Sequence, residues 1–167
     1  AFATGARVRS IHFHGHKDKD RFSTVAIPGK GTLSPIIERD MNALRALGLE
    51  IPTGRLPKIL LEPDELDRSL DRIERMGLTG PLLSLGLGAS RPTKAWPVER
   101  FAAIAHRWCE EKKGSVLALA SPDENELVRQ FAKLTQTQTR IRTETSLGMR
   151  DLASLLRQST LMLGNDS

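Results

Sequence analysis

Hydroxyl and basic side chains gather in the loop from Gly86 to Lys94, directly after a short apolar run. The side chains that could do chemistry there are Ser90, Thr93 and Lys94. A hydroxyl and bare backbone N–H groups at the end of a strand can donate hydrogen bonds to phosphate oxygens. A lysine ammonium can stabilise negative charge that develops on such a group, although exposed lysines often serve only solubility. The loop therefore predicts a site for a phosphorylated ligand.

Strands and helices alternate regularly after Gly80. Runs of strand length occupy 81–87, 115–120, 139–144 and 160–167, and helical patterns occupy 98–113, 121–134 and 146–158. This order is typical of an α/β fold with a doubly wound parallel sheet. The expected core faces of the three helices are Phe101, Ile104, Ala105 and Trp108; Leu127, Val128, Phe131 and Leu134; and Met149, Leu152, Ala153 and Leu156.

Polar loops follow each of these expected strands. In an open parallel sheet, ligands bind outside the carboxyl ends of the strands, so the loops should meet at one edge. Ser121 and Glu124 have the spacing of a capping box, and Ser146 is the candidate N-cap of the last helix. The other side chains expected at this edge are Asp123, Asp166 and Ser167.

The segment before Gly80 is less regular. Ser34 and Pro35 predict the start of a helix that Gly48 ends, and a second helix runs from about Asp64 to Gly77. That second helix offers few apolar residues and is expected on a surface. We interpret residues 1–77 as the tail of one domain with a connection, and 78–167 as a second domain that is incomplete at its end. The chain is expected to be an internal piece of a longer protein.

Composition excludes several classes of protein. No apolar run is long enough to span a membrane or to form a signal peptide, which predicts a cytoplasmic protein. The net charge of +5 favours an anionic partner, while 4% aromatic content without tyrosine argues against nucleic acid. The single cysteine, Cys109, lies in a helical pattern and is expected to be a buried apolar side chain.

Two other kinds of site are weaker interpretations. A zinc site is suggested by His12, His14 and His16, since alternate residues of a strand lie on one face. Gly15 and the charged residues that follow favour a loop instead. The segment GLGAS lacks the GxGxxG spacing of nicotinamide dinucleotide sites. Neither zinc nor a dinucleotide is therefore expected, and no metal or other cofactor is predicted.

Three segments together resemble the signatures of glycosyltransferase family 9, the heptosyltransferases of lipopolysaccharide assembly. They are GASRPTKAWPVERFAAIA, ALASPDENELV and SLGMRDLASLLRQSTLMLGNDS, and SPIIERDMNALRALGL is similar to the helix between the family's domains. The resemblance covers nearly the whole chain. It implies the C-terminal half of a two-domain GT-B enzyme, with Rossmann-like halves that hold a sugar nucleotide between them.

The resemblance also implies roles for individual residues. Lys94 would stabilise the departing diphosphate, and the donor would be held by Ser90, Thr93, Asp123 or Glu124, Ser146, Asp166 and Ser167. The family prefers two hydroxyls where this chain has Ala89 and Ser90, and the choice between Asp123 and Glu124 for the ribose stays open. The family's catalytic base lies outside this chain, which predicts that this piece alone is inactive.

The implied activity is transfer of a sugar, with inversion, from a nucleoside-diphosphate sugar to a lipopolysaccharide core. The expected donor is ADP-heptose, and the glycolipid acceptor would bring the enzyme to the anionic inner face of the inner membrane. The alternative is a Rossmann-like module that binds a nucleotide without transferring anything. Donor base, acceptor and oligomeric state are not determined by these residues.

Overall fold

The chain forms two compact units, residues 1–58 and 59–167, in the computed structural model. The structure describes residues 5–9, 24–25, 36–51 and 58–165. In the first unit, α1 (Ile36–Ala46) is the predicted helix, and Gly48 ends it with a positive φ of 82°. Arg45 bonds Glu38 and Asn42 along this helix at 3.1 and 2.7 Å.

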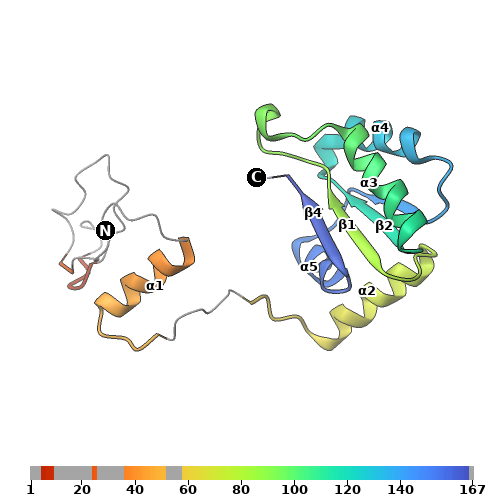
Figure 1. Cartoon of the computed structure of the whole chain (residues 1–167). Coiled ribbons are helices and arrows are strands. Elements are labelled where there is room, and N and C mark those ends of the chain that lie inside the picture. Colours follow the sequence, from red (N-terminus) through yellow and green to blue (C-terminus); the bar gives the residue numbers. More distant parts are fainter. Residues whose placement is uncertain (1–4, 10–23, 26–35, 52–57, 166–167) are drawn as a thin grey trace. The chain divides into compact units, whose positions relative to one another are not determined.

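The second unit contains a parallel four-stranded sheet in the order β3-β2-β1-β4 (Figure 1). Its strands are β1 (Leu82–Gly86), β2 (Ser115–Leu119), β3 (Ile141–Glu144) and β4 (Leu161–Gly164). The central strands β1 and β2 are buried almost throughout, because helices cover both faces of the sheet. At the edge, β4 leaves Leu161 and Met162 about half exposed. The predicted α/β class with a parallel sheet is confirmed.

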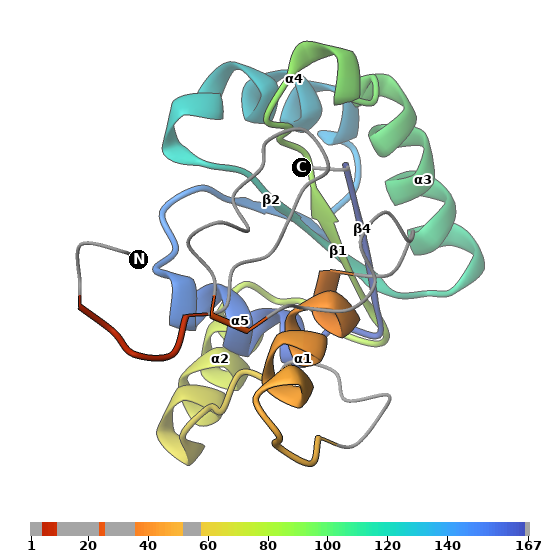
Figure 2. The same cartoon turned by 90° about the vertical axis from the view of Figure 1, so that its left-hand side faces the viewer.

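Helices lie on both faces of this sheet, as a doubly wound fold requires (Figures 1 and 2). On one face lie α3 (Val98–Glu111) and α4 (Asn125–Thr135), and on the other α2 (Pro63–Arg75) and α5 (Met149–Arg157). Short 3-10 turns, Pro92–Lys94 and Pro122–Glu124, precede α3 and α4.

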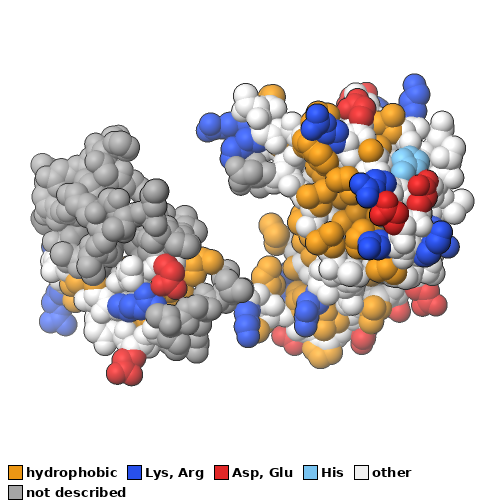
Figure 3. Space-filling model, viewed as in Figure 1, with side chains coloured by type: hydrophobic (Ala, Val, Ile, Leu, Met, Phe, Trp, Pro, Cys, Tyr) orange, Lys and Arg blue, Asp and Glu red, His pale blue; other side chains and the backbone are white. Residues whose placement is uncertain are grey.

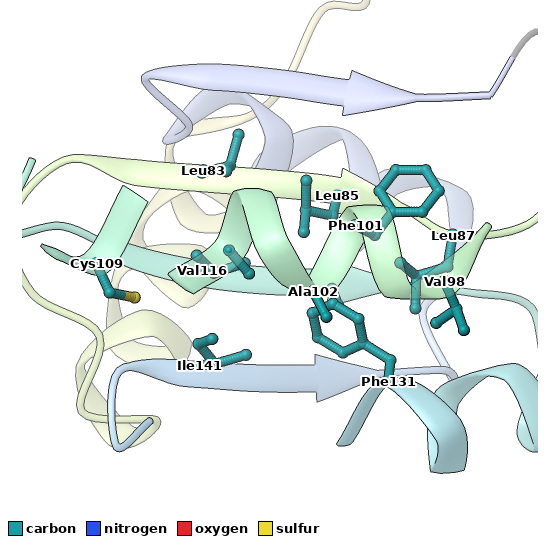
Figure 4. Packing of buried hydrophobic residues seen from close by; sticks show 12 residues of the cluster. Leu83, Leu85, Leu87, Val98, Phe101, Ala102, Cys109, Val116, Phe131 and Ile141 are labelled. Atoms are coloured by element: carbon teal, nitrogen blue, oxygen red, sulfur yellow. The ribbon is translucent and has the colours of Figure 1, made fainter. Parts of the chain in front are cut away.

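The larger core lies between the sheet and α3 and α4 (Figure 4). Phe101 and Phe131 are both fully buried there against the leucines of β1. Cys109 is also buried, and this burial raises the pKa of its thiol, as suits a small apolar side chain. The smaller core contains Leu117 and Leu155 on the opposite face.

Polar contacts attach α2 to α5 on that opposite face. Glu65 and Ser69 are the buried residues of α2. Arg150 donates to both carboxylate oxygens of Glu65, and the Gln158 amide donates to the Ser69 hydroxyl at 3.1 Å. The second unit begins at Ile59 and therefore includes α2.

Some local predictions were wrong. The N-cap of α5 is Gly148 rather than Ser146, and Met149, expected in the core, is 77% exposed. On α4, Leu134 is 43% exposed although it shares a helical face with buried Phe131. Both helices bury a narrower stripe than the apolar pattern suggests.

We predict that Phe131→Ala lowers the free energy of unfolding by about 3 kcal/mol or more, because it leaves a cavity in the core between α4 and the sheet. Leu134→Ala on the same helix should cost less than about 1 kcal/mol, because the leucine is largely exposed. Urea denaturation followed by circular dichroism measures both. Equal losses would contradict this assignment of the core.

The contact between Glu65 and Arg150 predicts a dependence of stability on acid. Hydrogen bonds from Arg150 and from the Glu62 N–H lower the pKa of Glu65 to about 2. In the unfolded chain the Glu65 carboxylate takes up a proton near pH 4.5. The stabilisation of the folded state by this contact is therefore complete above pH 4.5 and is lost as pH falls towards 2. In Glu65→Gln, melting temperatures measured between pH 5 and 2 should decline less than in the wild type. Parallel declines would show that the contact does not contribute.

Candidate functional site

The strand order places a candidate binding crevice at the carboxyl end of β1. The chain fills the sheet from β1 through β2 to β3 and then returns to the other side of β1 with β4. The crossover from β1 leads to β2 on one side, whereas the crossover from β3 leads to β4 on the other side, which makes the carboxyl ends of β1 and β4 a topological switch point. Ligands of open α/β sheets bind outside such a point.

The loop between β1 and α3 carries the predicted phosphate-binding side chains at this edge. Ser90, Thr93 and Lys94 are all exposed, and the last two lie in the 3-10 turn Pro92–Lys94. Within the turn, the Lys94 N–H donates to the Arg91 carbonyl at 3.0 Å. Lys and Arg side chains cover this projecting loop (Figure 3). The loop thus presents hydroxyls and positive charge to solvent beside the switch point.

Asn165 links the end of β4 to both ends of that loop. Its amide nitrogen donates to the carbonyl oxygens of Leu87 at 2.8 Å and Gly88 at 3.0 Å. Its amide oxygen accepts the N–H of Trp96 at 2.8 Å. Sequence analysis missed this residue, because an asparagine after a strand is equally typical of an ordinary turn.

The β2 end of the edge is built around Glu124. The predicted capping box is present: Glu124 accepts the Ser121 N–H at 2.8 Å, while the Ser121 side chain bonds the Glu124 backbone. The Glu124 carboxylate lies against Gly88, where an added Cβ would come within 2.1 Å of its Oε1. A side chain at position 88 would therefore displace the Glu124 carboxylate, which lies between the β1 and β2 loops. Asp123, by contrast, is exposed.

At the β3 end, Glu144 is held by an arginine from α2. Arg72 bonds its carboxylate at 2.5 Å, and the N–H groups of Thr145 and Ser146 donate to the other oxygen at 3.1 and 3.3 Å. Burial raises the pKa of Glu144, but the bonds from Arg72 and Ser146 outweigh burial and bring the pKa below its usual value. Ser146, predicted to bind the donor, is exposed in this loop. The ion pair was not expected from sequence, since α2 precedes the alternating pattern.

Several predicted features lie outside the described residues. These are Asp166 and Ser167 of the predicted donor site, and His12, His14 and His16 of the weighed zinc site. Among the residues the structure describes, no three His, Cys, Asp or Glu side chains form a group that could hold a metal ion. In the same part of the chain, none of the helices is long and apolar enough to cross a membrane.

These features define a Rossmann-like α/β protein with polar loops at the switch point of a parallel sheet. The family model for glycosyltransferase family 9 (heptosyltransferase) matches residues 6–167. The chain belongs to glycosyltransferase family 9. No significant match is found among curated protein sequences.

Three solved structures share the fold. The family 9 glycosyl transferase from Veillonella parvula DSM 2008 is 21% identical with a TM-score of 0.76, covering 88% of this chain and 42% of its own. The E. coli ADP-heptose lps heptosyltransferase II is 22% identical with a TM-score of 0.59, covering 73% of this chain and 37% of its own. The E. coli heptosyltransferase WaaC, solved with ADP-2-deoxy-2-fluoro heptose, is 14% identical with a TM-score of 0.62, and the match covers 88% of this chain and 44% of WaaC.

The family and the fold class are thereby confirmed as the sequence motifs predicted. The chain spans less than half the length of each of these solved structures. At identities of 14–22% the structures establish the fold alone. The donor, the acceptor and the roles of individual residues are therefore taken up below as proposals.

The close approach of Gly88 and Glu124 gives a testable prediction. In Gly88→Ala the new methyl group must displace the Glu124 carboxylate and break the capping box, which should cost about 1 kcal/mol of stability. In a Glu124→Ala background the same glycine substitution should cost much less, because the clashing group is gone. Urea denaturation of the wild type, the two single variants and the double variant measures the difference. Additive losses would mean that the two residues do not interact.

Proposed function

We propose that this protein binds a nucleoside-diphosphate sugar at the carboxyl edge of β1 and β4 and transfers the sugar, with inversion, to a lipopolysaccharide core acceptor. The observation that carries the proposal is the exposed loop with Ser90, Thr93 and Lys94 at the switch point of a family 9 chain. The proposed donor is ADP-heptose, by analogy with the two E. coli heptosyltransferases that share this fold.

Lys94 acts on the leaving group in this proposal. An acceptor hydroxyl loses its proton to a base outside this chain and attacks the anomeric carbon of the donor. The bond between that carbon and the diphosphate oxygen breaks, and the diphosphate leaves with one more negative charge. An ammonium held close to that oxygen stabilises the charge as it forms, so Lys94 would act most strongly on the transition state.

The remaining polar groups of the edge hold the donor. Ser90 and Thr93 donate to phosphate oxygens, and Asp166 and Ser167, which follow β4 in sequence, contact the sugar and phosphate. We assign the ribose hydroxyls to Glu124 rather than Asp123, because a backbone N–H orients the Glu124 carboxylate between two loops. Ser146 lies at the outer β3 loop and would contact the base.

The acceptor and the location follow from the same proposal. The net charge of +5 suits an enzyme that works on a phosphorylated glycolipid at the anionic inner face of the cytoplasmic membrane. The protein would be cytoplasmic and attached to that surface only peripherally. No nucleic acid partner is proposed.

Titration calorimetry of the full-length protein with ADP and with UDP tests the proposal. The wild type should bind ADP more tightly than UDP, and Lys94→Ala should weaken ADP binding about tenfold or more, the usual effect of losing a hydrogen bond between charged groups. Lys112→Ala is the matched control, because it removes an exposed lysine at the C-terminus of α3, at the far end of the sheet. It should leave ADP binding unchanged.

A transfer assay with ADP-heptose and lipopolysaccharide core separates the two candidate functions. Binding of ADP without any turnover would support the non-catalytic nucleotide-binding module instead. If neither nucleotide binds the wild type, the site itself is misassigned. If Lys94→Ala and Lys112→Ala have equal effects, Lys94 has no special role.

A further inference from the structure

The side chain of Asn165 connects β4 to the loop between β1 and α3 in a way that only a carboxamide allows. Two carbonyl oxygens, of Leu87 and Gly88, need donors, and the Trp96 N–H needs an acceptor. An asparagine supplies two N–H donors and one oxygen acceptor from a single short side chain. Aspartate would lose both donors, and leucine of similar size would lose every contact.

The points that Asn165 contacts are the two ends of the loop. Leu87 and Gly88 directly follow β1, and Trp96 comes just before α3. Between them, Ser90 to Ala95 are exposed and are held within the loop by the short-range bonds from Lys94 to Arg91 and from Ala95 to Pro92. These local bonds shape the 3-10 turn but do not attach it to the sheet.

The pairing of Gly86 with Gly164 sets the start of the loop beside β4, and further contacts attach the loop ends to other elements. The Leu87 N–H donates to Leu119 of β2 at 2.9 Å, which attaches the loop start to β2. The Trp96 ring packs edge-on against Phe101 at 5.0 Å between centroids, which attaches the loop end to α3. The hydrogen bonds of Asn165 connect both ends to the strand on the other side of the crevice.

We propose that Asn165 is a positioning residue, which ties both ends of the loop of Lys94 to the end of β4 and so orients Lys94 towards a diphosphate. This inference rests on the proposed function, since it assumes that Lys94 meets a diphosphate at this edge. Asn165 itself need not touch the ligand. It acts through the loop, so its loss should cost more where Lys94 is present.

A double-mutant cycle on the full-length protein, read by calorimetry with ADP, tests this dependence. Asn165→Leu should weaken ADP binding roughly tenfold, the order expected when a charged contact is no longer aligned. In a Lys94→Ala background the same substitution should weaken binding by a clearly smaller factor, because the Lys94 contact is already lost and only the loop hydroxyls remain to be misaligned. A merely structural role would weaken both proteins by the same factor.

Gln158→Leu is the matched control. It also removes a half-buried side-chain amide, one that donates to Ser69 near the amino end of β4. It should leave ADP binding unchanged while lowering stability to a similar extent. Asn165→Ser, which cannot span both contacts, takes the place of the leucine variant in the cycle if that variant does not fold.

Amide hydrogen exchange without ligand tests the link itself. In Asn165→Leu the N–H groups of Lys94, Ala95 and Trp96 should exchange faster than in the wild type and in Gln158→Leu. Suppose that the wild type binds ADP. The role of Asn165 alone is then overturned if Asn165→Leu leaves the dissociation constant unchanged, leaves the exchange rates unchanged, or weakens binding equally in both backgrounds. A wild type that binds neither ADP nor UDP would overturn the proposed function and this inference with it.

Discussion

Burial of β1 and β2 on both faces is the constraint on which the rest of this structure depends. A parallel sheet has no solvated face, so its central strands must be apolar along their length and must be covered by helices on each side. Each crossover helix then returns the chain to the amino edge of the sheet. All four strands consequently point the same way, and their polar loops meet at one edge.

Both helix layers pack on the sheet through apolar side chains. On the side of α3 and α4, aromatic and aliphatic side chains form a closely packed core around Phe101 and Phe131. On the other side, a smaller apolar core is supplemented by charged contacts of α2, through Glu65 to α5 and through Arg72 to β3. The Arg72 bond to Glu144 ends beside the candidate site, so the second layer also supports the loop that follows β3.

At the site, backbone groups are positioned by side chains from other strands. Glu124 orders the β2 loop and lies against Gly88, and Asn165 joins β1 to β4. In the proposed function, Glu124 meets the ribose while Lys94 and the hydroxyls of its loop meet the phosphates. Hydrogen-bond donors that are already in place suit phosphate binding better than donors that must be ordered when the ligand binds.

The sequence by itself determined the order of strands and helices, the buried central strands, the capping box at Ser121 and the family, because these depend on local periodicity and on motifs close together in the chain. It misplaced the N-cap of α5 and the exposed faces of Met149 and Leu134, since which side of a helix is covered depends on its position over the sheet. The attachment of α2 by Glu65 and Arg72, and the link from Asn165 to Trp96, were decided by tertiary structure alone. These pairs lie 69–85 residues apart, and only the return of β4 beside β1 and of α5 beside α2 brings them within hydrogen-bonding distance.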